Sequence, residues 1–191
     1  MNWVVWAVIG GIIVIILLWG VAIYNGLVRL RALAEEGFSG ITVQLRRRAD
    51  LIPNLVSTVE GYATHERETL TQVIAHRGDA VNAKGVAATA QADTAMSAMI
   101  GRLFAVAEAY PDLKANANFQ QLQGELSEIE EQLQGARRYY NATVRDLNTR
   151  IQSFPNVLIA RPMGFTEEEY YTDSDASIQV APKVQFGAAK A

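Results

Sequence analysis

The sequence predicts an all-α protein: a single N-terminal transmembrane helix, then an elongated antiparallel bundle of long helices and an irregular C-terminal tail. An uncharged apolar run covers residues 3–24. Apolar residues then recur every three or four positions over long stretches, as in helices with one buried face. No stretch of any length alternates apolar and polar residues as a strand does. We therefore divide the chain into a membrane anchor (1–26), a helical bundle (27–155) and a partly extended tail (156–191).

The composition narrows the functional classes. The chain has 191 residues, of which 19% are charged and 50% hydrophobic, with a net charge of -3. These values fit neither a disordered chain nor a basic nucleic-acid-binding protein. Cysteine is absent, which excludes disulfides, thiol catalysis and cysteine-ligated metals. Two histidines leave little material for a metal site or a proton shuttle.

The apolar run WVVWAVIGGIIVIILLWGVAIY begins at Trp3 and is long enough to cross a hydrocarbon core of roughly 30 Å. Trp3 and Trp6 mark one end and Trp19 and Tyr24 the other, as in the aromatic belts of membrane proteins. A cleaved signal peptide is the rival interpretation. It needs a basic start, a shorter apolar run and a small-residue cleavage site, and none is evident. We predict an uncleaved, single-pass membrane anchor.

Charges after the anchor predict its orientation. Arg29 and Arg31 follow the apolar run, whereas only the terminal amine precedes it. The positive-inside rule therefore places the bundle in the cytoplasm and the short amino end outside, across the inner membrane. Arg29 and Arg31 are also the expected contacts with lipid headgroups.

Small residues in the anchor suggest self-association. Ala7 and Gly11 are four residues apart, as are Ala22 and Gly26. This spacing lets two helices approach closely in lipid. We expect these four residues to form oligomer contacts in the membrane.

The first long helix is predicted to follow the anchor directly. Its apolar stripe runs from Leu27 to Ala63, lapses at Glu66 and resumes at Leu70 and Val73. Gly37 and Gly40 allow a bend. The segment RGDAVNAKG, residues 77–85, breaks the pattern and predicts a turn.

Two further helices are expected. One covers about residues 89–110 and is ended by Pro111, which lacks the amide hydrogen that a continuing helix needs. The next covers about residues 119–154 and is ended by Pro155. Its near-heptad apolar spacing predicts coiled-coil-like packing against the other helices.

The segment RRRADLIPNLV, which begins at Arg46, stands out within the first helix. Successive helical residues are about 100° apart, so Arg46, Arg47 and Arg48 cannot form one cationic face. Asp50 can pair with Arg46 or Arg47, and Asn54 continues the same row. We interpret Arg46, Arg48, Asp50 and Asn54 as polar contacts beside the core, with ligand binding as the alternative.

Lipid headgroups are a third possible partner for these arginines. In an upright helix Arg46 lies roughly 33 Å beyond Tyr24, at 1.5 Å per residue. Charges are screened within about 8 Å at physiological salt. The membrane is therefore out of reach unless the helix folds over near Gly37 and Gly40.

Pro53 removes the hydrogen bond to the carbonyl of Ala49, so a kink is expected there. Alternatively, one helix ends and another begins with Pro53 in its first turn. The unbroken apolar stripe across Pro53 favours a kinked continuation.

One row of the last long helix carries polar side chains beside its apolar stripe. Its members are Asn141, Arg145, Asn148 and Gln152. Amides beside a helical seam often fix register, which is the interpretation we favour. Alternatively, the row forms a polar partner groove that faces Arg48, Asp50 and Asn54.

No pattern of a reaction site is found. HERET, at His65, lacks the second histidine of a zinc-protease motif. Asn141-Ala-Thr143 has the letters of an N-glycosylation sequon but lies inside a predicted helix. Glu167 to Glu169 are interpreted as a solvated acidic run. We therefore predict that the protein is not an enzyme and has no catalytic residue. We also predict that it binds no metal, cofactor, small-molecule substrate or nucleic acid.

Several segments, in order, resemble the LemA family. They are the predicted N-terminal membrane helix, VQLRRRADLIPNLVSTVEGYATHERETL, YPDLKANANFQQLQGELSEIE, RRYYNATVRDLNTRIQSFPNVLIA, GF and the closing APKV-F. The resemblance covers nearly the whole chain and implies an elongated bundle of long antiparallel helices behind a membrane helix. One branch of that family is associated with building internal bacterial membranes. The family supplies no catalytic residue to carry over.

These observations favour a non-enzymatic membrane-anchored scaffold that self-associates through its helices and organises or shapes the bacterial membrane. Its expected partners are the lipid bilayer and further copies of itself, in a homo-oligomer. The alternative is an adaptor that binds another membrane protein, a protease or transporter, through its cytoplasmic bundle or tail.

Overall fold

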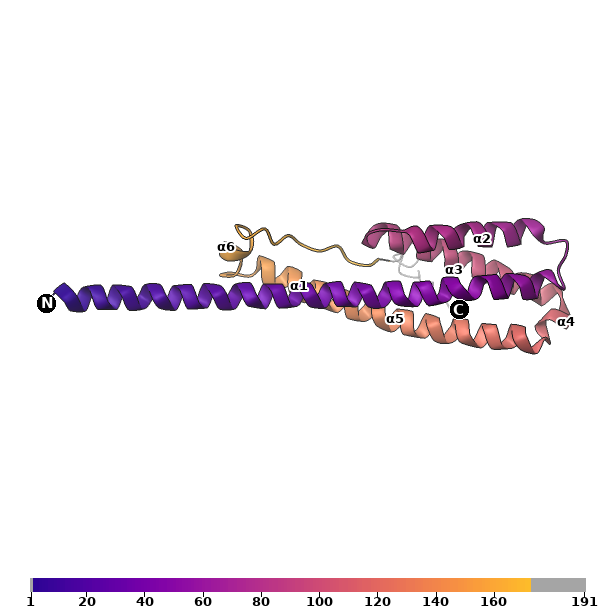
Figure 1. Ribbon diagram of the computed structural model, residues 1–191, viewed down its shortest axis with the longest axis horizontal. Coiled ribbons are helices and arrows are strands. Elements are labelled where there is room, and N and C mark those ends of the chain that lie inside the picture. The colour runs from indigo at the N-terminus through magenta and orange to yellow at the C-terminus, as the bar shows by residue number, and fades with distance from the viewer. Residues whose placement is uncertain (1, 173–191) are drawn as a thin grey trace, which may run out of the picture.

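The protein is an elongated helical bundle with one helix projecting far beyond it (Figure 1). The computed structural model describes residues 2–172, and within that range the chain is helical and has no strand. The helices are α1 (Asn2–Glu60), α2 (Arg67–Asn82), α3 (Val86–Ala109), α4 (Pro111–Lys114), α5 (Ala117–Gln152) and α6 (Val157–Ala160). The predicted fold class is confirmed. The end of the predicted tail, with its APKV segment, lies outside the described residues.

The α1 helix is the axis of the molecule. Beyond its projecting part it pairs with α5, while α2 and α3 cover only the part farthest from the N-terminus (Figure 1). The part of α1 that precedes Ile23 projects from the bundle.

The apolar side chains form two cores. The distal core, far from the anchor, lies between α1, α2, α3, α4 and the start of α5. It contains Ile52, Leu55, Val59, Val73, Met96, Leu103, Leu113 and Phe119. The proximal core lies mainly between α1, α5 and the chain after α6, and contains Ile23, Leu27, Ile41, Leu133, Tyr140, Val144, Leu147, Phe165 and Tyr171.

The first helix is shorter than predicted at its C-terminal end. Helix α1 stops at Glu60 and α2 folds back beside it, although the apolar pattern continued through Leu70 and Val73. The amides of Tyr62 and Ala63 both bond the carbonyl of Val59, which closes the helix. Ala63, Leu70 and Val73 are buried as predicted, but on both sides of the turn. The apolar pattern thus marked the buried positions, not an unbroken backbone.

The turn predicted at residues 77–85 is shorter in the structure. Helix α2 continues to Asn82, and only residues 83–85 connect it to α3. Gly85 lies at the N-cap of α3 with φ of 82°, a conformation that glycine adopts at no steric cost. Polar residues before it belong to the exposed face of α2, which explains the early loss of apolar periodicity.

The predicted α3 and α5 are confirmed to within a few residues. Pro111 ends α3 and opens the short helix α4. The side chain of Asn116 then caps α5, because its Oδ1 accepts hydrogen bonds from the amides of Asn118 and Phe119 at 2.9 and 3.1 Å.

Gly37 permits close packing of the two long helices. A Cβ atom at Gly37 would lie 3.1 Å from the Cα of Tyr140 and 3.2 Å from Cδ1 of Tyr139. Helix α1 runs without a break through Gly37 and Gly40. Gly37 therefore allows α1 to approach α5 closely, and α1 is not interrupted at this position.

Pro53 lies inside α1, which continues through it. The restart alternative is therefore wrong. Proline cannot donate to the carbonyl of Ala49, but Nε of Arg77 donates a hydrogen bond to that carbonyl oxygen at 2.9 Å. A side chain of α2 thus replaces the backbone bond that Pro53 removes.

Candidate functional site: the anchor and a buried ionic cluster

The anchor is exposed along its apolar run as far as Ala22, apart from the partly covered Gly20. It is the one helix in the described residues long and apolar enough to cross a membrane. Trp3, Trp6, Trp19 and Tyr24 are all exposed, and burial against the bundle begins at Ile23. About twenty apolar residues therefore have no covering from the rest of the described chain.

The two small-residue pairs of the anchor differ in their surroundings. A Cβ at Gly11 would meet nothing within 4 Å, and Ala7 is exposed. A Cβ at Gly26 would lie 3.5 Å from the Arg150 guanidinium. The Ala7–Gly11 pair is therefore open to another helix, whereas Gly26 is partly covered by α5.

Of the three consecutive arginines, only Arg48 is buried, with 6% of its surface exposed. Its Nη1 donates to Oδ1 of Asp93 at 3.2 Å and to Oγ of Ser97 at 2.9 Å. It also lies 3.3 Å from Oε2 of Glu130. Arg48 thus makes polar contacts with neighbouring helices, but it does so from a buried position, where it ties α1 to α3 and α5.

The other polar residues of this segment lie outside the core. Arg46 and Asn54 are exposed, and Arg47 donates to Oε1 of Gln132 at 3.0 Å. The predicted pairing of Asp50 with Arg46 or Arg47 is wrong: Asp50 lies 3.8 Å from the Arg77 guanidinium of α2. The hairpin formed by α1 and α2 brings that arginine nearer.

Asp93 is the centre of a buried ionic cluster. Its side chain is 1% exposed. While Oδ1 accepts from Arg48, Oδ2 accepts from Arg137 and from the hydroxyl of Tyr171, the latter at 2.7 Å. The Arg137 guanidinium also lies over the Tyr171 ring, 5.5 Å from its centroid. We call Arg48, Asp93, Glu130, Arg137 and Tyr171 the ionic cluster.

The ionic cluster balances two arginines with two carboxylates, so their charges cancel. Burial alone would lower the pKa of Arg137, but Asp93, Tyr171 and Glu130 outweigh this and raise it. Burial and the neighbouring Asp93 raise the pKa of Tyr171. Arg137 therefore remains charged and Tyr171 remains a hydrogen-bond donor across the physiological pH range.

The chain after α6 lies extended along α5, and we call residues 165–172 the strap (Figure 1). Asn148 donates to the carbonyl of Glu168 and accepts from its amide, each at 2.9 Å. Asn141 does the same with Tyr171, at 2.9 and 2.8 Å. Each asparagine thus pairs with one strap residue as a neighbouring strand would.

The spacing of the two asparagines matches the strap. Seven residues of an α-helix rise about 10.5 Å, and three extended residues span about 10 Å. Asn141 and Asn148 therefore meet Tyr171 and Glu168 in register. The proposed polar groove facing Arg48, Asp50 and Asn54 is wrong, because these amides hold the protein's own strap.

Tyr140 completes the attachment of the strap. Its hydroxyl donates to the carbonyl of Glu169 at 2.7 Å. Burial, with Glu168 and Glu169 nearby, raises the pKa of Tyr140 to about 12. The exposed Glu167 and Glu169 side chains agree with a solvated acidic run, although the strap backbone is held.

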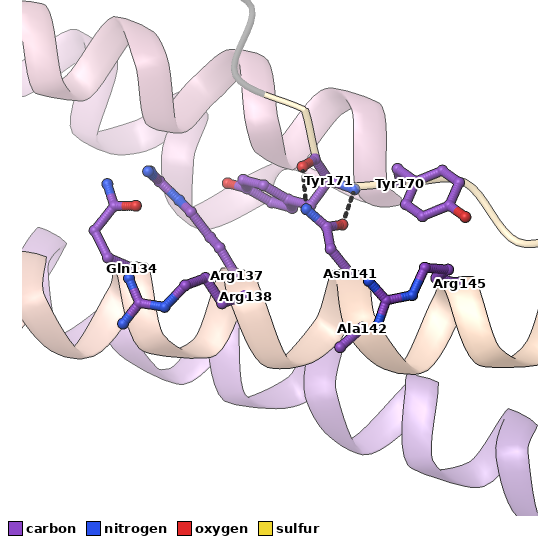
Figure 2. Close-up of a pocket in the computed structure, with 8 residues that line it drawn as sticks. All are labelled: Gln134, Arg137, Arg138, Asn141, Ala142, Arg145, Tyr170 and Tyr171. Carbon is purple, nitrogen blue, oxygen red and sulfur yellow. Dashed lines mark hydrogen bonds between the residues drawn. The ribbon is translucent and has the colours of Figure 1, made fainter.

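A surface hollow of about 440 Å³ lies beside the strap. Figure 2 shows its lining: Gln134, Arg137, Arg138, Asn141, Ala142, Arg145, Tyr170 and Tyr171. Arg138, Arg145 and Tyr170 are exposed, and Nε of Arg145 lies 3.7 Å from Oδ1 of Asp146. The row predicted on α5 therefore divides into two asparagines, Asn141 and Asn148, that hold the strap, and the exposed Arg145 and Gln152.

The polar side chains of this region join structural elements to one another. The carboxylates of the ionic cluster are matched by arginines, and the Ser97 hydroxyl accepts a hydrogen bond from Arg48. Within residues 2–172, no three side chains of the metal-binding acidic, histidine and cysteine types gather. The arrangement joins α1, α3, α5 and the strap at one carboxylate.

Sequence reasoning missed the centre of the ionic cluster. Asp93 lies on the apolar stripe of α3, three residues before Met96, and both are buried. An acid on an apolar stripe is a signal that a buried cation must face it. The partners Arg137 and Tyr171 could not be recognised without the fold, since they lie 44 and 78 residues away.

The comparisons with known proteins agree with this fold. The LemA family model matches residues 37–186. "Magnetosome protein MamQ 1" of Paramagnetospirillum magneticum is 25% identical over 179 residues, covering 80% of this chain and 66% of that protein. "Magnetosome protein MamQ" of Magnetospirillum gryphiswaldense is 24% identical, with the same coverage. "Protein LemA" of Metamycoplasma hominis is 25% identical over 140 residues, covering 73% of this chain and 64% of that protein.

The chain thus spans just under two thirds of the length of these relatives. The family match begins at Gly37, where α1 approaches α5, and extends through the ionic cluster and the strap. Since it covers well over half of the sequence, this chain belongs to the LemA family.

Proposed function

We propose that this protein is a non-enzymatic, membrane-anchored scaffold that self-associates through its helices. One observation carries the proposal: the exposed apolar run and the wall of both cores are parts of the same helix, α1, which is 59 residues long. A continuous helix transmits orientation, so an arrangement of anchors in the membrane also arranges the bundles.

The exposed face of the anchor supports self-association in the membrane. Ala7 and Gly11 offer a surface on which a second helix can approach closely. Arg29 and Arg31, exposed just beyond the apolar run, support an orientation with the bundle in the cytoplasm, at the inner membrane.

The ionic cluster supports a structural role rather than a catalytic one. Buried charge pairs contribute little net stability but can fix one arrangement of helices. Here they fix four segments at Asp93. A bundle with one defined shape suits a subunit that repeats in an assembly. The association of one LemA branch with internal bacterial membranes supports extending the proposal to organising or shaping a membrane.

The test is the mass of the full chain in mild detergent and in lipid nanodiscs. We expect a discrete homo-oligomer. Ala7→Leu with Gly11→Leu adds bulk to the open face and should shift the mass to the monomer. Ile9→Phe with Ile13→Phe, on the opposite face, should leave it unchanged. A monomer of the unaltered chain in both media would contradict the proposal.

A second candidate is an adaptor for another membrane protein, a protease or transporter. The basic hollow beside the strap favours it, because Arg138 and Arg145 are exposed there. An adaptor should be monomeric when purified and should copurify with its partner. Arg138→Glu with Arg145→Glu should then release the partner, while leaving the mass of the scaffold assembly unaffected if the first proposal holds.

A further inference from the structure

The end of the bundle nearest the anchor carries an unusual apolar surface. Phe154, Leu158 and Met163 are 81%, 65% and 62% exposed. Among the large apolar side chains of residues 25–172, these three are the most exposed. They lie in one short segment around α6, which we call the foot (residues 153–164).

The foot lies beside the apolar run of α1. A Cβ at Gly20 would be 3.7 Å from Cδ1 of Ile159. Directly after the foot, the Phe165 ring packs edge-on against Tyr24, with centroids 5.7 Å apart. Figure 1 shows α6 beside α1 where the projecting part of that helix begins. The foot is therefore level with the last turns of the anchor.

That level corresponds to the edge of a bilayer. If the hydrocarbon core begins near Trp3, about 20 residues at 1.5 Å each cross roughly 30 Å. The core then ends near residue 22. Gly20 and its neighbour Ile159 would lie at the boundary between acyl chains and headgroups.

The backbone and charges of the foot suit this boundary. The amides of Val157, Ile159, Ala160 and Met163 bond carbonyls within the foot, which lowers the cost of leaving water. Residues 150–165 contain Arg150 and Arg161 and no acidic residue. Apolar side chains beside arginines are typical of segments that lie in a membrane interface and meet anionic headgroups.

We propose that the foot is a second membrane contact, in which Phe154, Leu158 and Met163 insert into the headgroup–acyl boundary of the bilayer that α1 spans. Arg150 and Arg161 then join Arg29 and Arg31 at the headgroups. Two contacts, from segments far apart in the sequence, fix the rotation of α1 about its axis as well as its depth. This inference rests on the proposed anchoring by α1, and its test separates the two.

The absence of cysteine allows single labels. Phe154→Cys, Leu158→Cys and Met163→Cys would each carry an environment-sensitive fluorophore, on the full chain in vesicles of phosphatidylcholine and phosphatidylglycerol. Leu17→Cys, in the anchor, is the positive control. Ile74→Cys, on α2, is the matched negative control, because Ile74 is also an apolar residue and is 53% exposed. Quenching is measured with a nitroxide attached near the lipid headgroup.

We expect the three foot labels to lose most of their emission to the lipid-attached nitroxide and to be blue-shifted, while the Ile74 label keeps its emission. Foot labels that behave like the Ile74 label, with the Leu17 label buried in lipid, would overturn the foot and leave the anchor intact. A water-exposed Leu17 label would instead overturn the anchoring and the foot together. Foot labels that are shielded from water but not quenched would indicate coverage by a second copy, which also overturns the lipid contact.

Discussion

The distal and proximal halves of the bundle achieve the same burial by different means. In the distal half, helices α1 to α5 all contribute to a core of aliphatic, methionine and phenylalanine side chains. In the proximal half, α1 has mainly α5 beside it, and the strap supplies a further layer. An extended strap cannot satisfy its own backbone groups. The proximal half therefore depends on specific side-chain hydrogen bonds, whereas the distal half depends on apolar packing.

The ionic cluster lies where these two halves meet, and removing its centre should have the largest effect. Asp93→Asn leaves two buried arginines facing fewer charges, which should cost about 3–5 kcal/mol of unfolding free energy. Asp146→Asn, at an exposed position, should change it by less than about 0.5 kcal/mol. Denaturant unfolding of the full chain in detergent measures both. Equal changes of unfolding free energy in the two variants would show that the ionic cluster stabilises the fold no more than an exposed charge does.

A substitution at Gly37 tests how closely α1 and α5 must approach each other in the proximal half. Gly37→Ala places a methyl 3.1 Å from the Tyr140 backbone and should cost about 1–3 kcal/mol by overpacking. Gly124→Ala, in α5, meets nothing within 4 Å and should stabilise the protein by roughly 0.5–1 kcal/mol. Thermal unfolding of the two variants should therefore shift in opposite directions.

In the distal half, one side chain replaces a backbone bond. Arg77→Met leaves the Ala49 carbonyl without the bond at 2.9 Å and should cost about 1–3 kcal/mol. In a Pro53→Ala background the restored amide can bond Ala49, so the cost of Arg77→Met should shrink. A double-mutant cycle of unfolding free energies measures this coupling. Additive costs would mean that Arg77 does not act on that carbonyl.

The strap should be separable from the distal half. Asn148→Ala removes two hydrogen bonds to Glu168 and should cost about 1–3 kcal/mol, felt mainly in the strap. Arg145→Ala, on the same face of α5 but exposed, is the matched control. Hydrogen exchange should accelerate in the strap and remain slow in α2 and α3 for Asn148→Ala alone. Faster exchange throughout the bundle would show that the two halves unfold together.

The smallest effect concerns alkaline pH. Because burial and Glu168 and Glu169 raise the pKa of Tyr140 to about 12 in the folded protein, folding favours its neutral form. This contribution is fully present below pH 10 and is lost as pH rises toward 12. Tyr140→Phe should therefore show a shallower loss of stability between pH 10 and 12 than the unaltered chain. An identical slope in both proteins would assign the alkaline loss to other groups.

The sequence by itself determined the long apolar helix at the N-terminal end, the helical class, the positions of α3 and α5 and most of the buried stripe. These features depend on local composition and on a periodicity that any segment carries within itself. The LemA resemblance, carried by ordered segments, was likewise readable and is confirmed. Even so, the stripe that runs through Leu70 and Val73 did not reveal the turn after Glu60, because both sides of that turn face one core.

Only the tertiary structure decided which polar residues act together. The sequence pattern does not distinguish Arg48 from Arg46, since both are interpreted from it as polar contacts beside the core. Only Arg48 is buried, because the α2–α3 hairpin brings Asp93 to its side of α1. The roles of Asn141 and Asn148 depended on strap residues that are 30 and 20 positions away, respectively. Burial and charge pairing act through space at a few ångströms, and a linear pattern holds no record of which distant segments meet.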